Sequence, residues 1–167
     1  MTSRQAISFL VGLLLVLFVS ASVLAADEQL YGTWRLVSFK TTVLGTGESR
    51  DVMGNSPQGF YSFGRDGRAL CLIVSDKRPR VPDLAKLTDQ ERAELFKTTI
   101  AYGGTYTFDG KTLKLRVDIS WNENWTGTEQ TRLVKFEGNR LLLSTIPAPS
   151  VLDGKPVTAV ITWERVQ

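Results

Sequence analysis

The 167-residue chain contains no histidine and only one cysteine, Cys71. Without histidine, the Ser-His and Cys-His schemes of nucleophilic catalysis are excluded. The commonest side-chain ligand of zinc and copper is also missing, so we expect no metal and no cofactor. A single cysteine cannot form an intrachain disulfide. Cys71 lies in the apolar segment 69–74, which is typical of a strand with a small buried thiol.

Sequence signatures for phosphate binding are missing as well. The chain has neither a Gly-x-x-x-x-Gly-Lys loop nor a dinucleotide fingerprint between a strand and a helix. Its 20 basic and 17 acidic residues give a net charge of only +3, and the basic residues are scattered among the acidic ones. We therefore expect no binding to nucleic acid.

The first 25 residues have the pattern of a secretory signal peptide: one charge at Arg4, an apolar run over 7–19, and small residues up to Ala25. A membrane anchor is the alternative, but a run of about 13 apolar residues is shorter than the roughly 20 that a spanning helix needs. We expect residues 1–25 to be a signal peptide and residues 26–167 to form one domain. The mature protein would be periplasmic or secreted, with no stable membrane span.

Eight short segments with alternating apolar and polar residues follow, and turn signals separate them. The expected strands cover residues 30–43, 58–64, 68–75, 102–108, 111–121, 127–137, 140–146 and 157–166. In the fifth segment the apolar positions from Leu113 to Ile119 alternate with charged ones, so we expect them to face the core. The fold class is therefore all-β. Eight antiparallel strands can close into an up-and-down barrel that is filled by side chains or holds one small ligand.

The two-residue alternation of apolar and polar positions stops between Asp76 and Thr99. Thr88 and Glu91 have the spacing of a helix-capping box, and a few apolar residues follow in a charged stretch. We expect one short surface helix that lies over an end of the sheet. A lid over a ligand entrance is the functional alternative.

Six short motifs follow one another along the chain. They are Gly32–Phe39 (GTWRLVSF), Pro57–Phe60 (PQGF), Asp66–Arg68 (DGR), Tyr102–Tyr106 (YGGTY), Asn124–Arg132 (NWTGTEQTR) and Thr162–Val166 (TWERV). In order and spacing this set resembles the lipocalin-like domain family of bacteria and fungi. The resemblance implies a calycin-type barrel in which Trp34 lies across the closed end. It also implies that Arg165 packs on this indole, so that both residues have structural roles.

Arg132 is a candidate ligand-binding residue because of its place in the alternation. It shares a strand face with Gln130, Val134 and Phe136, so Arg132 and Gln130 point inward if the two apolar residues do. A charge inside a barrel is costly unless it is paired. The partner is either a group of the protein, in an ion pair or a network with tyrosines, or the carboxylate or carbonyl of a ligand.

Aromatic residues are further candidates for the wall of a binding site. Tyr102 and Tyr106 alternate onto one face of their strand, and Tyr61 and Trp121 lie in positions suited to a wall or a rim. For each of these residues simple core packing is the alternative.

These observations favour a binding protein that holds a small hydrophobic or amphipathic molecule in the barrel lumen. One alternative is a structural or interaction module of the cell envelope with a filled core. Another is an isomerase- or cyclase-type enzyme, which the lack of histidine and of a clear base disfavours. The choice among the three rests on fold analogy, and a fold does not determine a function.

The signal pattern predicts cleavage after Ala25, so that the mature protein begins Ala26-Asp27-Glu28. N-terminal sequencing of secreted or periplasmic material would test this. Recovery of an intact, membrane-anchored chain would contradict it.

Overall fold

The computed structural model describes residues 28–150 and 154–166, and the expected signal peptide lies outside these ranges. The strands are β1 (Gly32–Val43), β2 (Ser49–Asp51), β3 (Gln58–Phe63), β4 (Arg68–Val74), β5 (Thr99–Phe108), β6 (Thr112–Ser120), β7 (Glu129–Glu137), β8 (Arg140–Thr145), β9 (Ala148–Pro149) and β10 (Pro156–Arg165). The helical elements are η1 (Leu84–Lys86), α2 (Asp89–Lys97) and η2 (Glu123–Trp125).

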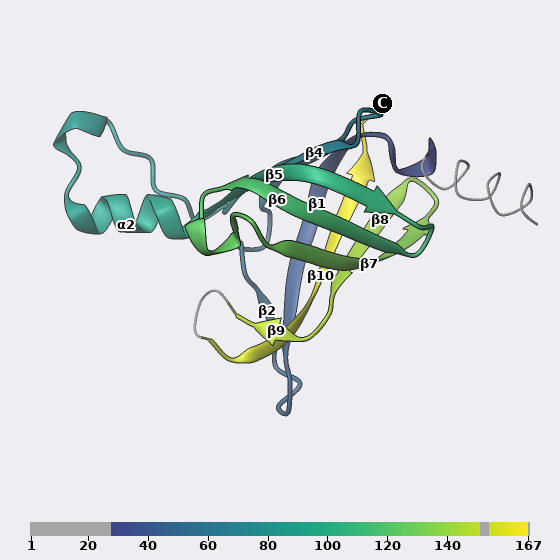
Figure 1. The fold of residues 1–167 in the computed structure, drawn as a ribbon. Coiled ribbons are helices and arrows are strands. Elements are labelled where there is room, and N and C mark those ends of the chain that lie inside the picture. The colour runs from purple at the N-terminus through teal and green to yellow at the C-terminus, as the bar shows by residue number, and fades with distance from the viewer. Residues whose placement is uncertain (1–27, 151–153, 167) are drawn as a thin grey trace, which may run out of the picture.

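Eight of the strands close into an antiparallel barrel (Figure 1). The strands β1, β3 to β8 and β10 pair in that order, and β10 pairs back with β1 to complete the ring. The short strands β2 and β9 pair with β1 and β10 outside this ring. The eight-stranded barrel that the alternating segments predict is thus confirmed.

The two ends of the barrel are built differently. At one end tight turns join β3 to β4, β5 to β6 and β7 to β8, and Gly67, Gly110 and Gly138 of these turns have positive φ. Glycine adopts this conformation without the strain that a Cβ would cause. At the other end the connections are longer, and they cover residues 44–57, 75–98, 121–128 and 146–155. We call these the turn end and the long-loop end.

Trp34 and Arg165 close the turn end. The Trp34 side chain is 1% exposed, and its Nε1 donates a hydrogen bond to the Leu30 carbonyl oxygen at 2.9 Å. The Arg165 guanidinium carbon lies 4.2 Å from the centre of the indole. Arg165 also donates to the carbonyl oxygens of Tyr31, at 2.7 Å, and Gln29. A cation-π contact of this kind contributes about 0.5–2 kcal/mol.

A β-bulge in β1 changes which of its residues point into the barrel. The register with β10 shifts between Leu36 and Ser38, so Val37 is an extra residue. Before the bulge Trp34 and Leu36 are buried, and beyond it Thr41 is buried. An extra residue reverses the alternation of a strand, because side chains alternate with a period of two.

A second bulge corrects one expectation about β6. Gly103 pairs with Ile119 and Gly104 pairs with Val117, so Asp118 is the extra residue. A Cβ on Gly104 would lie 1.9 Å from the Arg116 carbonyl oxygen, so the bulge needs glycine at this close approach. Ile119 is 66% exposed. The expectation that it faces the core is wrong, because the bulge turns this end of β6 over.

The helix α2 forms as the capping box predicts, but it does not lie over the end of the sheet. Thr88 Oγ1 accepts a hydrogen bond from the Glu91 N–H, and the Glu91 carboxylate accepts one from the Thr88 N–H. The connection over residues 75–98, which we call the arm, carries the helix away from the barrel (Figure 1). None of the residues of α2 is buried. Its surface is mostly charged, so it has little apolar area to pack on the barrel.

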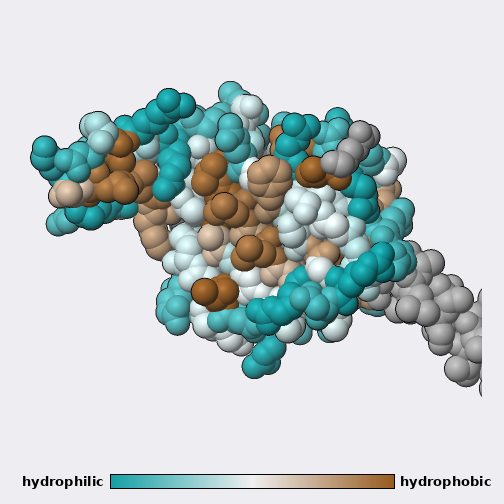
Figure 2. Space-filling model, turned by 90° about the horizontal axis from the view of Figure 1, so that it is seen from above, coloured by the Kyte–Doolittle hydropathy of each residue, from teal (hydrophilic) through white to brown (hydrophobic). Residues whose placement is uncertain are grey.

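Apolar side chains also gather on part of the outer wall (Figure 2). Phe60 of β3 lies opposite Leu72 of β4, and Gly103 of β5 lies between Leu70 and Ile119. These four apolar side chains are 47–66% exposed. The outward positions of β3, β4 and β6 therefore depart from the polar-out pattern of a solvated sheet face.

Truncation of the closing residues should separate their contributions to stability. We expect Trp34→Ala to lower the free energy of unfolding by about 3–5 kcal/mol, because it leaves a cavity in a buried site. Arg165→Ala should cost less. Leu84→Ala, at a residue that is 68% exposed, is the control and should change stability by at most about 0.5 kcal/mol. Urea melts would measure all three, and a Trp34→Ala variant as stable as the wild type would contradict the role of the indole.

Candidate functional site

A cavity of about 310 Å³ opens at the long-loop end of the barrel. Apolar side chains of Phe39, Ile100 and Ile161 contribute to its wall, together with the polar side chains of Gln130 and Arg132. We call this space the mouth cavity. Its volume lies in the range of small-molecule sites.

A smaller cavity of about 30 Å³, the inner cavity, adjoins it deeper in the barrel. Tyr61, Tyr102 and Trp163 line only this deeper space, whereas Phe39, Ile100 and Arg132 line both. Arg132 therefore lies where the two cavities meet.

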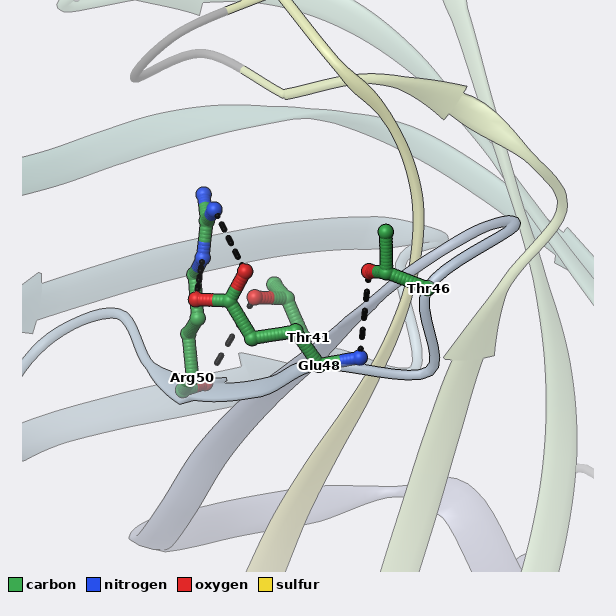
Figure 3. A network of polar contacts seen from close by, with 4 residues as sticks. All are labelled: Thr41, Thr46, Glu48 and Arg50. Carbon is green, nitrogen blue, oxygen red and sulfur yellow. Dashed lines mark hydrogen bonds and ion pairs between the residues drawn. The ribbon is translucent and has the colours of Figure 1, made fainter.

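Polar contacts organise one part of the rim (Figure 3). The Thr41 side chain lines the mouth cavity, and its hydroxyl donates a long hydrogen bond to the Arg50 carbonyl oxygen at 3.5 Å. The Arg50 guanidinium pairs with the Glu48 carboxylate at 2.8 Å, and Thr46 Oγ1 accepts from the Glu48 N–H at 3.3 Å. The hydrogen bonds and the ion pair that stabilise this part of the rim thus all lie within the hairpin of β1 and β2.

In the described part of the chain, the hydrogen bonds of the Arg132 guanidinium come from its own strand. Its Nη2 donates to Gln130 Oε1 at 3.2 Å, and its Nη1 donates to the Thr131 carbonyl oxygen at 2.8 Å. Within residues 28–150 and 154–166 no carboxylate forms a salt bridge with Arg132, and Glu129 at the mouth lies 3.9 Å from Lys114 Nζ. The guanidinium carries a positive charge and five N–H donors, so it brings charge and spare donors to the lumen.

Tyr61, Tyr102 and Cys71 form a buried group beside the inner cavity. Their exposed fractions are 2%, 7% and 0%, and the two tyrosine rings lie 6.1 Å apart in an edge-to-face arrangement. Burial raises the pKa of both phenols well above their ordinary value and raises the pKa of the Cys71 thiol to about 12. All three groups stay protonated at neutral pH, so none of them is poised to act as a general base.

The structure places Tyr106 and Trp121 away from the two cavities. The Tyr106 hydroxyl donates to the Gly64 carbonyl oxygen at 2.9 Å near the turn end, where the ring packs edge-on against Phe63. The Trp121 ring lies 4.8 Å from that of Trp125 and also packs against Phe96 of the arm. Of the six predicted ligand-binding residues, Tyr61, Tyr102, Gln130 and Arg132 therefore line the lumen.

Several residues of the cavity wall are absent from the sequence-based set, and Trp163 and Phe39 are two examples. Trp163 is 1% exposed, and its alternation with Ile161 on the last strand could have identified it. Phe39 follows the bulge at Val37, and the period-two pattern contains no signal for its inward position.

Within residues 28–150 and 154–166, no group of three or more Cys, Asp or Glu side chains is placed to hold a metal ion. No helix in the same ranges is long and apolar enough to cross a bilayer.

The closed antiparallel barrel and its cavity define the class of protein, a small all-β barrel domain, and comparison with known proteins makes the assignment specific. The chain belongs to the lipocalin-like domain family, whose model matches residues 31–166.

One relative is the 4'-hydroxy-3'-methoxypropiophenone carrier protein ppsC of Aspergillus oryzae, which is 32% identical over 87 residues that cover 47% of this chain and 78% of the relative. Among solved structures, an uncharacterized protein from Bacteroides eggerthii is similar at 13% identity with a TM-score of 0.39, over 82% of this chain and 99% of that one.

The environment of Cys71 predicts its reactivity. At mildly alkaline pH the folded protein should not react with iodoacetamide, because the thiol is fully buried and its pKa is raised to about 12. The unfolded protein in denaturant should be alkylated at one site per chain, as mass spectrometry would show. Rapid alkylation of the folded protein would mean that the lumen beside Cys71 opens to solvent.

Proposed function

We propose that this protein is an exported carrier that binds one small hydrophobic or amphipathic molecule in the lumen of its barrel. The observation that carries the proposal is the mouth cavity of about 310 Å³, with the Arg132 guanidinium, which has no carboxylate partner among the described residues, where it meets the inner cavity. Apolar walls supply affinity through burial, and a few polar groups supply orientation. A module with a filled core would not need an open space of this size.

The relative from Aspergillus oryzae supports the same function. Its name describes a carrier of an aryl ketone that bears a phenol and a methoxy group. A molecule of this kind has an apolar ring and oxygen acceptors at its edges. The lumen of the present barrel offers a matching combination, because its apolar wall surrounds the donors of Arg132 and Gln130.

The export part of the proposal rests on the first 25 residues. The charge at Arg4, the apolar run and the small residues before Ala26 together favour a cleaved signal peptide. A carrier that leaves the cytoplasm would take up its ligand in the periplasm or outside the cell.

Replacement of Arg132 tests the ligand-binding role. We expect Arg132→Met to weaken the binding of acidic amphiphiles such as octanoate by about 1.5–3 kcal/mol, the range for a hydrogen bond to a charged group. Binding of butylbenzene, a neutral hydrocarbon, should change much less. Displacement of a fluorescent apolar probe would measure both affinities.

Arg116→Met is the matched control, because it removes the same charge from an exposed position on β6. It should leave both affinities unchanged. Equal octanoate binding by the wild type and Arg132→Met would refute the role of Arg132. If the wild type binds neither compound, the carrier function itself fails.

A further inference from the structure

The indole nitrogen of Trp163 is a buried donor without a partner. Trp163 lies on β10 with 1% of its side chain exposed, and its Nε1 has no hydrogen-bond partner among the described residues. By contrast, the equally buried Nε1 of Trp34 donates to the Leu30 carbonyl oxygen at 2.9 Å. Buried donors are nearly always paired, so an exception of this kind calls for an explanation.

The surroundings of Trp163 identify the kind of group that would pair with it. Trp163 lines the inner cavity together with Arg132, Tyr61 and Tyr102. An indole offers only a donor, the guanidinium offers donors and a positive charge, and the two buried phenols keep their protons. None of the described residues that line this cavity is acidic. The group that would pair with Trp163 Nε1 is therefore a hydrogen-bond acceptor. A negatively charged acceptor would also balance the charge of Arg132.

The dimensions of the lumen suit such a group at the end of a longer molecule. A volume of about 30 Å³ corresponds to roughly two water-sized spheres, which matches the oxygens of a small head group. The apolar side chains of Phe39, Ile100 and Ile161 line both cavities, so an apolar body can continue from the inner cavity into the mouth cavity.

We propose that the lumen takes an anionic amphiphile head first, with its carboxylate or other oxyanion held jointly by Trp163 Nε1 and Arg132. The apolar body then lies along the wall of the mouth cavity. This inference rests on the proposed carrier function and deepens it, because it specifies the charge of the ligand and its direction in the barrel. Trp163 is the residue that distinguishes this mode from binding at the mouth alone.

The indole N–H signal of Trp163 tests the contact in the wild-type protein. Hydrocinnamate, an aryl carboxylate, is added, and the tryptophan indole resonances are followed in a proton–nitrogen correlation spectrum. The resonance that is missing in Trp163→Phe identifies Trp163, and the already paired Trp34 is the internal control. We expect the Trp163 resonance to move downfield, as a new hydrogen bond requires, and the Trp34 resonance to stay in place. If hydrocinnamate binds and the Trp163 resonance does not move, the inference is wrong.

Affinities provide a second, independent test. Trp163→Phe keeps an aromatic ring but removes the donor, so hydrocinnamate should bind about tenfold more weakly, the loss expected for one hydrogen bond to a charged acceptor. Butylbenzene has no acceptor and should bind with affinity unchanged within about twofold. Calorimetry or probe displacement would give both values.

The outcomes separate the two proposals. If Trp163→Phe weakens both ligands equally, or leaves hydrocinnamate unaffected, Trp163 only packs in the wall and the head-first mode is refuted while the carrier function stands. If the wild type binds neither hydrocinnamate nor butylbenzene, the carrier function is refuted and the inference fails with it.

Discussion

The pairing of β1 with β10 is the interaction on which the rest of the structure depends. It runs from Trp34 opposite Arg165 at the turn end to Val43 opposite Val157 at the long-loop end. Without it the sheet would have two open edges with unpaired backbone groups and no enclosed lumen. The same register also brings Arg165 over the Trp34 ring, so one pairing both closes the sheet and covers its end.

The inner cavity is electrostatically one-sided. Arg132 brings a positive charge to this space, whereas the neighbouring Tyr61, Tyr102 and Cys71 are neutral because they are buried. A charge that is withdrawn from water is normally tolerated when an opposite charge or several acceptors surround it. Arg132 is partly buried, and the acceptors that the described residues give it are Gln130 Oε1 and the Thr131 carbonyl oxygen. The polar groups can therefore set the orientation of a ligand whose affinity comes from the apolar wall.

Much of the fold could be predicted from the sequence because alternation and turn residues are local signals. All eight barrel strands, the Thr88 capping box and the Trp34–Arg165 contact lie where the sequence or the family resemblance indicates them. Positions beyond the bulges could not be predicted, since one extra residue reverses the alternation without a signature of its own. Ile119 and Phe39 are both of this kind. The position of Tyr106 near the turn end could not be predicted either. Alternation shows which face of a strand a side chain lies on, but not how deep in the barrel it lies.

The division of the barrel into a turn end and a long-loop end has an evolutionary consequence. The contacts of Trp34 and Arg165 all lie at the turn end, whereas the connections over 44–57, 75–98, 121–128 and 146–155 surround the entrance. Each doubling of the length of a flexible loop costs only about 0.6 kcal/mol of closure entropy. The entrance can therefore accept insertions and substitutions that the strands cannot. Homologues that share this scaffold can diverge in what they admit long before they diverge in how they fold.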